Sequence, residues 1–220
     1  MKTLAVISRK GGAGKTTLSV NLAITAHLSG LKTMLADIDP QRSASDSLRA
    51  RTGDGPVLAE INAGKLFSTQ VQAQHSLFDA LVIDTPASPE SEVLQAIHCA
   101  DLSVLVCRPT FLDIASVVRS AEAVRRLGKK GVIVLSQAPP RRNGIEPPAV
   151  LKAAEALRFT GMPLAPIGLR ARNAFQQSVA HGRSVCEWEP GSAAAEEISR
   201  LWDLIAPMLF GQEDIQARAG

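Results

Sequence analysis

Short apolar runs recur along the chain and alternate with segments whose apolar residues are spaced three to four apart. The runs predict buried strands, at residues 3–8, 33–36, 81–84, 102–107 and 131–136, with weaker strand patterns at 57–61 and 163–169. The other segments have the spacing of amphipathic helices, at residues 18–26, 43–51, 64–75, 113–124, 148–159 and 192–209. This alternation predicts an α/β fold with a mostly parallel sheet and helices on both faces.

Length and composition fit one globular unit. The chain has 220 residues and 45% hydrophobic content, enough for one full core. We find no repeat, low-complexity segment or linker, so we expect a single domain over residues 1–220 with an acidic C-terminal tail at about 211–220. No run of 18 apolar residues occurs, the first strand follows Met1 directly, and the three cysteines lack paired spacing. We therefore expect a cytoplasmic protein with no membrane partner.

A glycine-rich turn follows the first predicted strand and precedes a predicted helix. Glycines let the backbone turn its N–H groups toward an anion, and the helix start adds partial positive charge. In this setting Lys15 is expected to contact the β- and γ-phosphates and Thr16 to ligate Mg²⁺. The predicted nucleotide site comprises Lys10, Gly11, Gly12, Ala13, Gly14, Lys15, Thr16 and Thr17.

Aspartates follow two other predicted strands. Asp84 ends an apolar strand, the arrangement in which a carboxylate holds Mg²⁺, often through a water. Asp37 and Asp39 lie on the same side of an extended chain at the end of the second strand. Each of these two is also a candidate for a turn or for the cap of the helix at 43–51, an interpretation that suits Asp37 better than Asp39.

Several of these segments together resemble the ParA/MinD family of ATPases. The turn has Arg9 where the usual phosphate loop has glycine, and Lys10 next to it resembles the family's deviant Walker A motif. The run at 37–41 and the sequence Asp84-Thr85-Pro86 are similar to the ParA branch, and residues 109–113 resemble a segment that contributes to its dimer interface. No helix-turn-helix segment precedes the loop, as in the short ParA type.

The resemblance implies a specific activity. ATP with Mg²⁺ would be enclosed in a homodimer, with Lys10 reaching the partner's nucleotide and Lys15 holding the phosphates. Asp39 would orient the attacking water and is a candidate to contact Mg²⁺ through water, while Thr16 and Asp84 would hold the metal. A small adaptor protein would stimulate hydrolysis, and the cycle would position a plasmid, chromosome or protein cluster. The family commonly has Asn or Arg after the sixth strand; Ser136 and Gln137 stand there, so the adenine contacts stay open.

The net charge of +3 is unevenly distributed. Residues 118–183 carry 12 basic and 3 acidic side chains, whereas residues 184–220 carry 2 basic and 7 acidic ones. Such a basic block is where a polyanion would bind. We therefore expect nonspecific, nucleoid-associated DNA binding, with candidate contacts Arg141, Arg142, Lys152, Arg158, Arg170, Arg172 and Arg183. The competing interpretation is that several of these simply cover a solvated face.

Proteins with three other functions carry a similar glycine-rich loop. A MinD-like spatial regulator at a membrane would need a basic amphipathic C-terminal helix, but the tail is acidic. A reductase of the nitrogenase iron-protein type would need two well-separated cluster cysteines, and Cys99 and Cys107 are only eight positions apart. A biosynthetic synthetase would need a substrate pocket that the sequence does not reveal.

Overall fold

The computed structural model describes residues 1–88 and 90–211. A parallel sheet runs through its centre in the order β3-β2-β4-β1-β5-β6. The strands are β1 (Lys2–Ile7), β2 (Thr33–Asp37), β3 (Val57–Glu60), β4 (Ala80–Asp84), β5 (Leu102–Cys107) and β6 (Lys130–Leu135). The expected α/β class is confirmed, and the weak pattern at 57–61 is a strand. The acidic tail predicted at 211–220 lies, apart from Gly211, outside the described residues.

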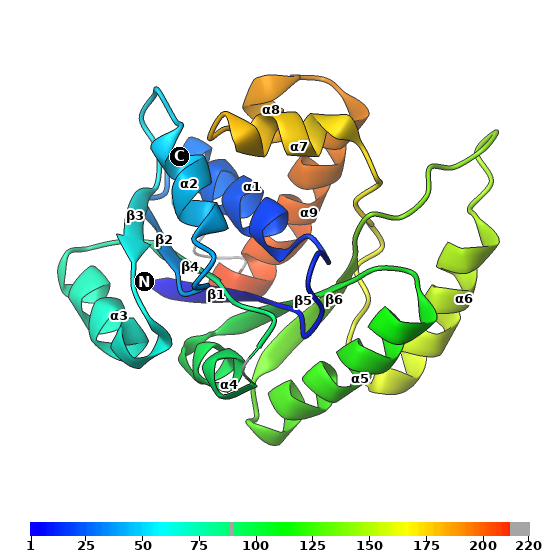
Figure 1. Ribbon diagram of the computed structural model, residues 1–220, viewed down its shortest axis with the longest axis horizontal. Helices are drawn as coiled ribbons and strands as arrows, with labels where there is room; N and C mark the ends of the chain where they lie inside the picture. Colours follow the sequence, from blue (N-terminus) through cyan, green and yellow to red (C-terminus); the bar gives the residue numbers. More distant parts are fainter. Residues whose placement is uncertain (89, 212–220) are drawn as a thin grey trace.

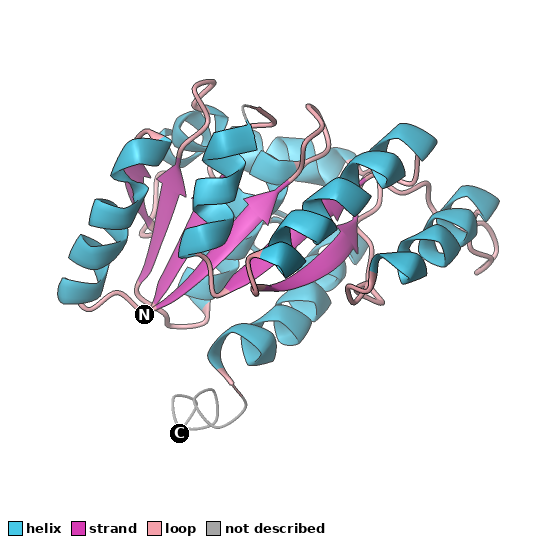
Figure 2. Cartoon of the chain, turned by 90° about the horizontal axis from the view of Figure 1, so that it is seen from below, coloured by secondary structure: helices cyan, strands magenta, loops and turns pink. Residues whose placement is uncertain are grey.

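Helices cover both faces of this sheet (Figures 1 and 2). They are α1 (Lys15–Leu28), α2 (Ser43–Arg49), α3 (Leu66–His75), α4 (Glu90–Cys99), α5 (Phe111–Arg126), α6 (Pro148–Leu157), α7 (Asn173–Ala180), α8 (Val185–Trp188) and α9 (Ala193–Phe210), with 3₁₀ turns at Ala63–Lys65 and Arg158–Thr160. No helix in the described part of the chain combines the length and apolar character needed to cross a bilayer.

Alternation along the strands explains the two layers. Successive strand side chains point to opposite faces, so Leu4 and Val6 join one core cluster with α1 and α9, while Ala5 and Ile7 join the other with α4 and α5. Because both faces are covered, the strands appear in the sequence as unbroken apolar runs. The carboxyl ends of all six strands meet at one edge, where parallel sheets bind their ligands.

The strand predicted at 163–169 is not a regular strand. This segment runs beside β6 and makes only two isolated bridges, Ile133 with Leu164 and Ala138 with Arg170. Pro163 and Pro166 lack the N–H that a continuous ladder needs. The segment nevertheless hydrogen-bonds to β6 at intervals, for example from Leu169 N to Leu135 O at 2.8 Å. It therefore extends the sheet edge without forming a seventh strand.

Candidate functional site

The glycine-rich turn joins β1 to α1 at the carboxyl edge of the sheet. Gly12 and Gly14 adopt positive φ angles of 69° and 93°, a backbone conformation that residues with a Cβ atom rarely adopt. Gly14 is the N-cap of α1, and no side chain caps that helix start. Its first N–H groups therefore stay available for an anion, which fits a phosphate cradle.

Lys15 is buried inside this turn, with only 6% of its surface exposed. Burial lowers the pKa of the Lys15 ammonium, and the nearby carboxylates Asp84 and Asp39 act in the opposite direction. An ammonium held in a low-dielectric site interacts strongly with a phosphate placed beside it. The position of Lys15 thus suits the role expected from its motif.

Asp84, at the end of β4, is fully buried directly beneath α1. Its two oxygens accept hydrogen bonds from Thr16 Oγ1 at 2.9 Å and Ser19 Oγ at 2.8 Å. Burial raises the pKa of this carboxyl to about 7, although both hydroxyls favour the ionised form. Sequence reasoning missed Ser19, which lies three positions after Thr16 and so on the same helix face.

The Thr16–Asp84 pair fits a magnesium ion. Mg²⁺ keeps several waters and takes only one or two protein carboxylates together with substrate phosphates. In the described part of the chain no group of three or more His, Cys, Asp or Glu side chains gathers around a possible metal position. A buried carboxylate whose ionisation is opposed by its surroundings would gain from an adjacent cation.

Asp37 and Asp39 have separate roles. Asp37 is fully buried, and its oxygens accept hydrogen bonds from the N–H groups of Asp39 and Ser45 and from the Ser45 hydroxyl. Asp37 therefore stabilises the first turn of α2. This is the structural role that the sequence favoured for Asp37 more than for Asp39. Asp39 is half-buried and faces the cavity in front of the glycine-rich turn, with one oxygen accepting from Gln41 N at 2.9 Å.

Most of the predicted residues line one cavity of about 610 Å³. Its lining includes Gly11, Gly12, Gly14, Lys15, Thr16, Thr17 and Asp39, together with Gln41, Ser43 and the Pro86–Ser88 turn. A smaller cavity of about 260 Å³ adjoins it and shares Gly14, Thr17 and Gln137. It is otherwise lined by Ser136, residues 169–173, Phe175 and Gln176. Together they offer a polar compartment for phosphates and a neighbouring recess.

Ser136 and Gln137 support the turn from behind. Ser136 Oγ donates to Ala13 O and Gln137 Nε2 to Gly12 O, both at 2.6 Å. These bonds fix the curvature of the glycine-rich turn from the end of β6. The sequence suggested only a possible base contact for these two residues, because a bond between segments over 120 positions apart leaves no local pattern.

Comparison with known proteins decides the family. Residues 4–185 match the CobQ/CobB/MinD/ParA nucleotide-binding domain. The chain is 33% identical over 214 residues to maintenance of carboxysome distribution protein A of Gloeobacter kilaueensis, covering 91% of this chain and 95% of that protein. A shorter match, 46% identical over 52 residues, covers 24% of this chain and 21% of the chromosome-partitioning ATPase Soj of Treponema pallidum.

The chain belongs to the ParA/MinD family.

The fold agrees with solved structures of the family. The septum site-determining protein MinD of Pyrococcus horikoshii, in complex with Mg-ADP, superimposes with a TM-score of 0.74 at 16% identity, covering 93% of this chain and 95% of that one. The expected resemblance to ParA/MinD ATPases and the P-loop NTPase fold are thereby confirmed. Members of this family are generally ATPases that bind nucleotide with magnesium, and ATP and Mg²⁺ are plausible ligands of this member.

Lys10, the residue typical of the family's deviant loop, lies outside the nucleotide cavity. Its neighbours Gly11 and Gly12 line that cavity, but Lys10 does not. The Lys10 side chain lies instead near Asp113 in α5. Burial opposes ionisation of Asp113, yet hydrogen bonds from Arg108 and Thr110, and the charges of Arg108 and Lys10, hold its pKa below the usual value.

The start of α5 corrects one detail of the sequence interpretation. Thr110, rather than Asp113, is the N-cap, and its side chain accepts from Asp113 N. Asp113 instead forms an ion pair with Arg108 at 2.9 Å. Thr110 is favoured because an N-cap needs an extended backbone, and Thr110 has a φ of −120° and a ψ of 151°, whereas Asp113 lies within the first helical turn.

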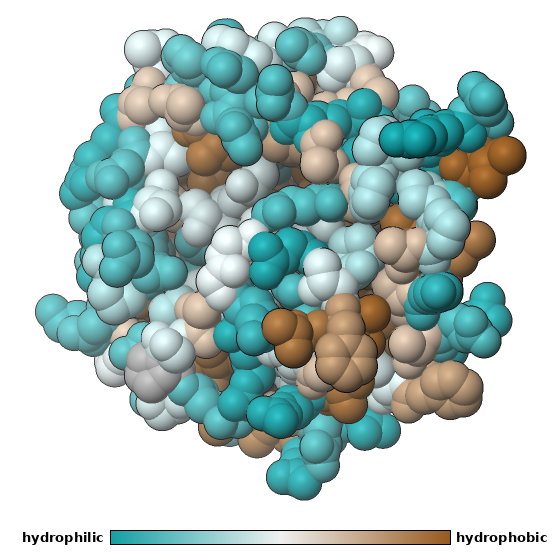
Figure 3. Space-filling view, turned by 45° about the vertical axis from the view of Figure 1, so that its right-hand side comes forward, coloured by the Kyte–Doolittle hydropathy of each residue, from teal (hydrophilic) through white to brown (hydrophobic). Residues whose placement is uncertain are grey.

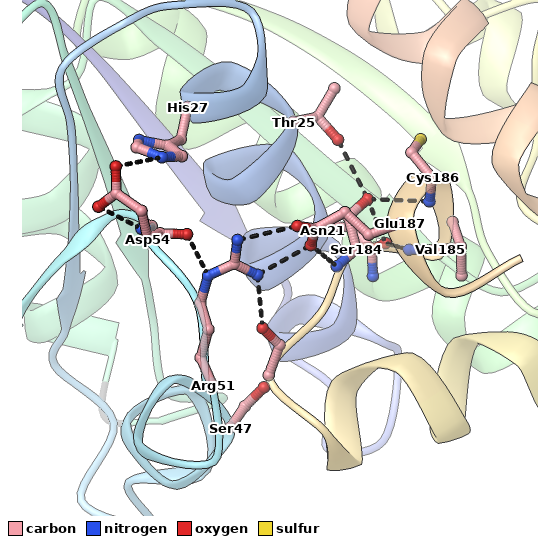
Figure 4. A network of polar contacts seen from close by, with 12 residues as sticks. Asn21, Thr25, His27, Ser47, Arg51, Asp54, Ser184, Val185, Cys186 and Glu187 are labelled. Carbon is pink, nitrogen blue, oxygen red and sulfur yellow. Dashed lines mark hydrogen bonds and ion pairs between the residues drawn. The ribbon is translucent and has the colours of Figure 1, made fainter. Parts of the chain in front are cut away.

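A polar network ties α1 to the C-terminal helices (Figure 4). Asn21 in α1 accepts from Val185 N at 2.8 Å and donates to Thr17 O at 2.8 Å. Arg51, after α2, makes two 2.8 Å hydrogen bonds to Glu187 and one of 3.0 Å to Gly182 O. Residues 182–185 thus anchor the nucleotide-binding helix and the segment after α2 to the C-terminal part of the chain.

Of the seven DNA-contact candidates, three line one groove. Arg141, Arg170 and Arg172 border a single groove, but Arg142, Lys152, Arg158 and Arg183 do not line it. Arg170 pairs with Glu146 at 2.6 Å and Arg172 with Glu197 at 2.7 Å. Arg170 exposes only 10% of its side chain. The sequence block of net positive charge is therefore partly neutralised in space by carboxylates from other elements.

Proposed function

We propose that this chain is a positioning ATPase that encloses ATP and Mg²⁺ between two copies and binds DNA without sequence preference. An adaptor stimulates hydrolysis, and repeated cycles move a cargo such as a plasmid, a chromosome or a protein cluster. The observation that carries the proposal is the meeting of Lys15, Thr16 and Asp39 around one cavity, with Asp84 hydrogen-bonded to Thr16 and Lys10 outside the cavity.

Catalysis in this proposal rests on positioning and charge neutralisation, since phosphoryl transfer needs little covalent chemistry from the protein. The N–H groups of the glycine-rich turn and the Lys15 ammonium hold the phosphates. Thr16 and Asp84 would hold Mg²⁺, which would supply positive charge between the phosphates. Asp39 faces the same cavity and orients the attacking water. The adjoining recess beside Gln137 takes the base.

Dimerisation follows from the placement of Lys10. A cation that turns away from its own nucleotide cavity is available to the nucleotide of a partner. Two exposed apolar side chains of α5, Phe111 (82% exposed) and Leu112 (63% exposed), lie within two residues of Asp113, whose pKa responds to Lys10. Apolar patches are visible on the face that carries α5 and α6 (Figure 3). Burial of such side chains between two copies would stabilise a dimer.

The cargo is inferred from relatives. One relative is named for the maintenance of carboxysome distribution, and another for chromosome partitioning. Both names describe the placement of a large body inside a cell. Nonspecific DNA binding would give such an ATPase a surface on which to act, and would make it nucleoid-associated in the cytoplasm.

A reductase that shares an iron–sulfur cluster between subunits is less well supported. Cluster ligands are thiolates, and Cys107 is 1% exposed with its pKa raised to about 12 by burial. Cys99 is also a free cysteine whose pKa burial raises. Neither cysteine lines the nucleotide cavity.

The Asp39→Ala variant tests the proposed cycle. It removes the water-orienting carboxylate but leaves the phosphate cradle intact, so ATP should trap a long-lived dimer and hydrolysis should fall about 100-fold or more.

A second measurement tests DNA binding. The affinity of the protein for two unrelated DNA duplexes is measured over a range of salt concentrations, with ATP and with ADP. Equal affinity in both nucleotide states, or marked preference for one duplex, would count against DNA binding by an ATP dimer. Hydrolysis at the parent rate would exclude Asp39 from catalysis.

A further inference from the structure

Four arginines line a groove of about 430 Å³ that shares two lining residues with the base recess. Arg170 and Arg172 border both spaces. The groove is completed by Arg141 from the loop between β6 and α6 and by Arg200 from α9. Arg141 and Arg200 expose 60% and 61% of their side chains. Two carboxylates of α9, Glu196 and Glu197, also line it.

Glu146 links two of these arginines. It lies on the loop that projects between β6 and α6 (Figure 1). Both of its oxygens accept from Arg170, at 2.6 and 2.9 Å, and one also accepts from Arg141 Nε at 2.7 Å. The hydrogen bonds to Arg170 and then Arg141 lower the pKa of Glu146 to about 2, against the effect of burial.

The contacts of Glu146 differ from those of Glu197. Glu197 accepts from the backbone N–H of Arg170 at 2.9 Å as well as from Arg172, so it supports the fold of the segment. The hydrogen bonds of Glu146 in the described residues all come from guanidinium groups. Arg170 also donates to Pro139 O at 2.8 Å, a bond that would keep it in place without Glu146.

A guanidinium presents the same planar pair of donors to a carboxylate and to a phosphate. We propose that Glu146 stands in for a nucleic-acid phosphate between Arg141 and Arg170, and that DNA displaces it when it occupies the groove. This inference rests on the proposed DNA binding and adds an internal competitor to it. Glu146 on its projecting loop thus lowers the affinity of the free protein for DNA and is exchanged for a phosphate on binding.

The test compares Glu146→Gln with Glu196→Gln. Both remove one negative charge beside the same groove, but Glu196 is 69% exposed and lies 3.8 Å from its arginine, so its loss frees no tightly held guanidinium. Binding of a labelled 24-base-pair duplex is measured across salt with ATP present. We expect Glu146→Gln to bind about three- to tenfold tighter at each salt concentration, while its log–log salt slope stays within about 0.9, or one phosphate, of the parent's, because both complexes contact the same phosphates. Glu196→Gln should change affinity less than about twofold.

A second comparison does not depend on the folding of Glu146→Gln. In the parent protein the Arg141 guanidinium is paired with Glu146 at 2.7 Å, whereas Arg200 lies 3.8 Å from Glu196. Arg200→Gln should therefore weaken DNA binding more than Arg141→Gln. In the Glu146→Gln background the loss of DNA affinity caused by Arg141→Gln should grow, because no carboxylate then competes with the phosphate for this guanidinium. A larger loss for Arg141→Gln than for Arg200→Gln in the parent would overturn the inference.

The remaining outcomes separate this inference from the proposed function. If the parent binds DNA with ATP but Glu146→Gln gains no more than Glu196→Gln, only the competitor role is wrong. If no variant binds DNA in any nucleotide state, both proposals are wrong. If Glu146→Gln binds poly-glutamate more tightly than the parent does but gains no affinity for DNA, the groove belongs to an acidic protein partner, which would contradict the nucleic-acid assignment.

Discussion

The nucleotide cavity and the arginine groove are both built around charged side chains, but they are assembled in different ways. The cavity takes its lysine and its two threonines from one continuous turn at 11–17, to which the segments after β2 and β4 add Asp39, Gln41, Ser43 and the Pro86–Ser88 turn. The groove takes its arginines from a loop, an irregular edge segment and α9. In the cavity Lys15 remains available for a ligand, whereas in the groove Arg170 and Arg172 are paired with carboxylates.

This difference shows which charges are available for binding. Lys15, fixed by a tight backbone turn, remains available because its ammonium forms no ion pair among the described residues, although Asp84 and Asp39 are near enough to affect its pKa. Long arginine side chains brought together by tertiary structure find carboxylates from other elements, and each pair reduces the net field. Net charge along a stretch of sequence therefore overstates the polyanion affinity of a surface that recruits acidic residues from elsewhere.

The largest effect is expected for Lys15→Ala in the cavity. Loss of the ammonium removes a charge-assisted contact from a site shielded from water, so ATP–Mg²⁺ affinity should fall at least about 100-fold, or about 2.7 kcal/mol. Isothermal calorimetry measures this directly. Lys65→Ala is the matched control, since Lys65 is exposed and lies outside the cavity. Equal ATP affinity in Lys15→Ala and the parent would disprove the phosphate-cradle assignment.

The two regions also differ in how well the sequence predicts them. The strands, the main helices and the turn at 10–17 follow from local periodicity and from glycine positions, because their geometry is set by neighbouring residues. Ser19, Ser136 and Gln137 carry little sequence signal, since their roles depend on contacts made across the sheet. No sequence pattern predicts the pairing of Arg170 with Glu146 either, because side chains 24 positions apart meet here only through tertiary structure.

An effect of similar size, on stability rather than on binding, is expected where the C-terminal segment packs against α2. A Cβ on Gly182, whose φ is +63°, would lie 2.5 Å from Ser47 O and 2.6 Å from Arg51 N. Gly182→Ala should therefore destabilise the protein by about 2–4 kcal/mol through overpacking and backbone strain.

Gly191→Ala is the control for backbone strain alone. Gly191 has a similar φ of +77° with nothing within 4 Å of a built Cβ, so its cost should be about 1 kcal/mol. Urea denaturation of both variants measures the difference. Equal destabilisation would show that the close packing on α2 contributes nothing.

The smallest effect concerns the pH dependence of the groove. The folded-state pKa of Glu146 is about 2, below the ordinary value of 4.5, so its ion pairs stabilise the protein above about pH 5. That contribution is lost as pH falls toward 2. Glu146→Gln should lower the unfolding free energy by about 1–3 kcal/mol at pH 7.

The gap between Glu146→Gln and the parent should narrow as pH falls below about 5. Chemical denaturation at pH 7, 5 and 4 measures it, with Glu155→Gln on α6 as a control, since no ion pair of the described residues involves Glu155. A gap that stays constant over this range would show that the Glu146 carboxylate does not stabilise the fold through its charge.

The central claim is that the cavity works only when two copies share it through Lys10. The decisive measurement is light scattering of Lys10→Ala with ATP, alongside its ATP affinity by calorimetry. Because Lys10 does not line its own cavity, monomeric ATP affinity should stay within about threefold of the parent while the ATP-dependent dimer is lost. Arg9→Ala, which removes a neighbouring cation paired with Glu90, should retain the dimer. An ATP dimer of undiminished affinity in Lys10→Ala would contradict the account.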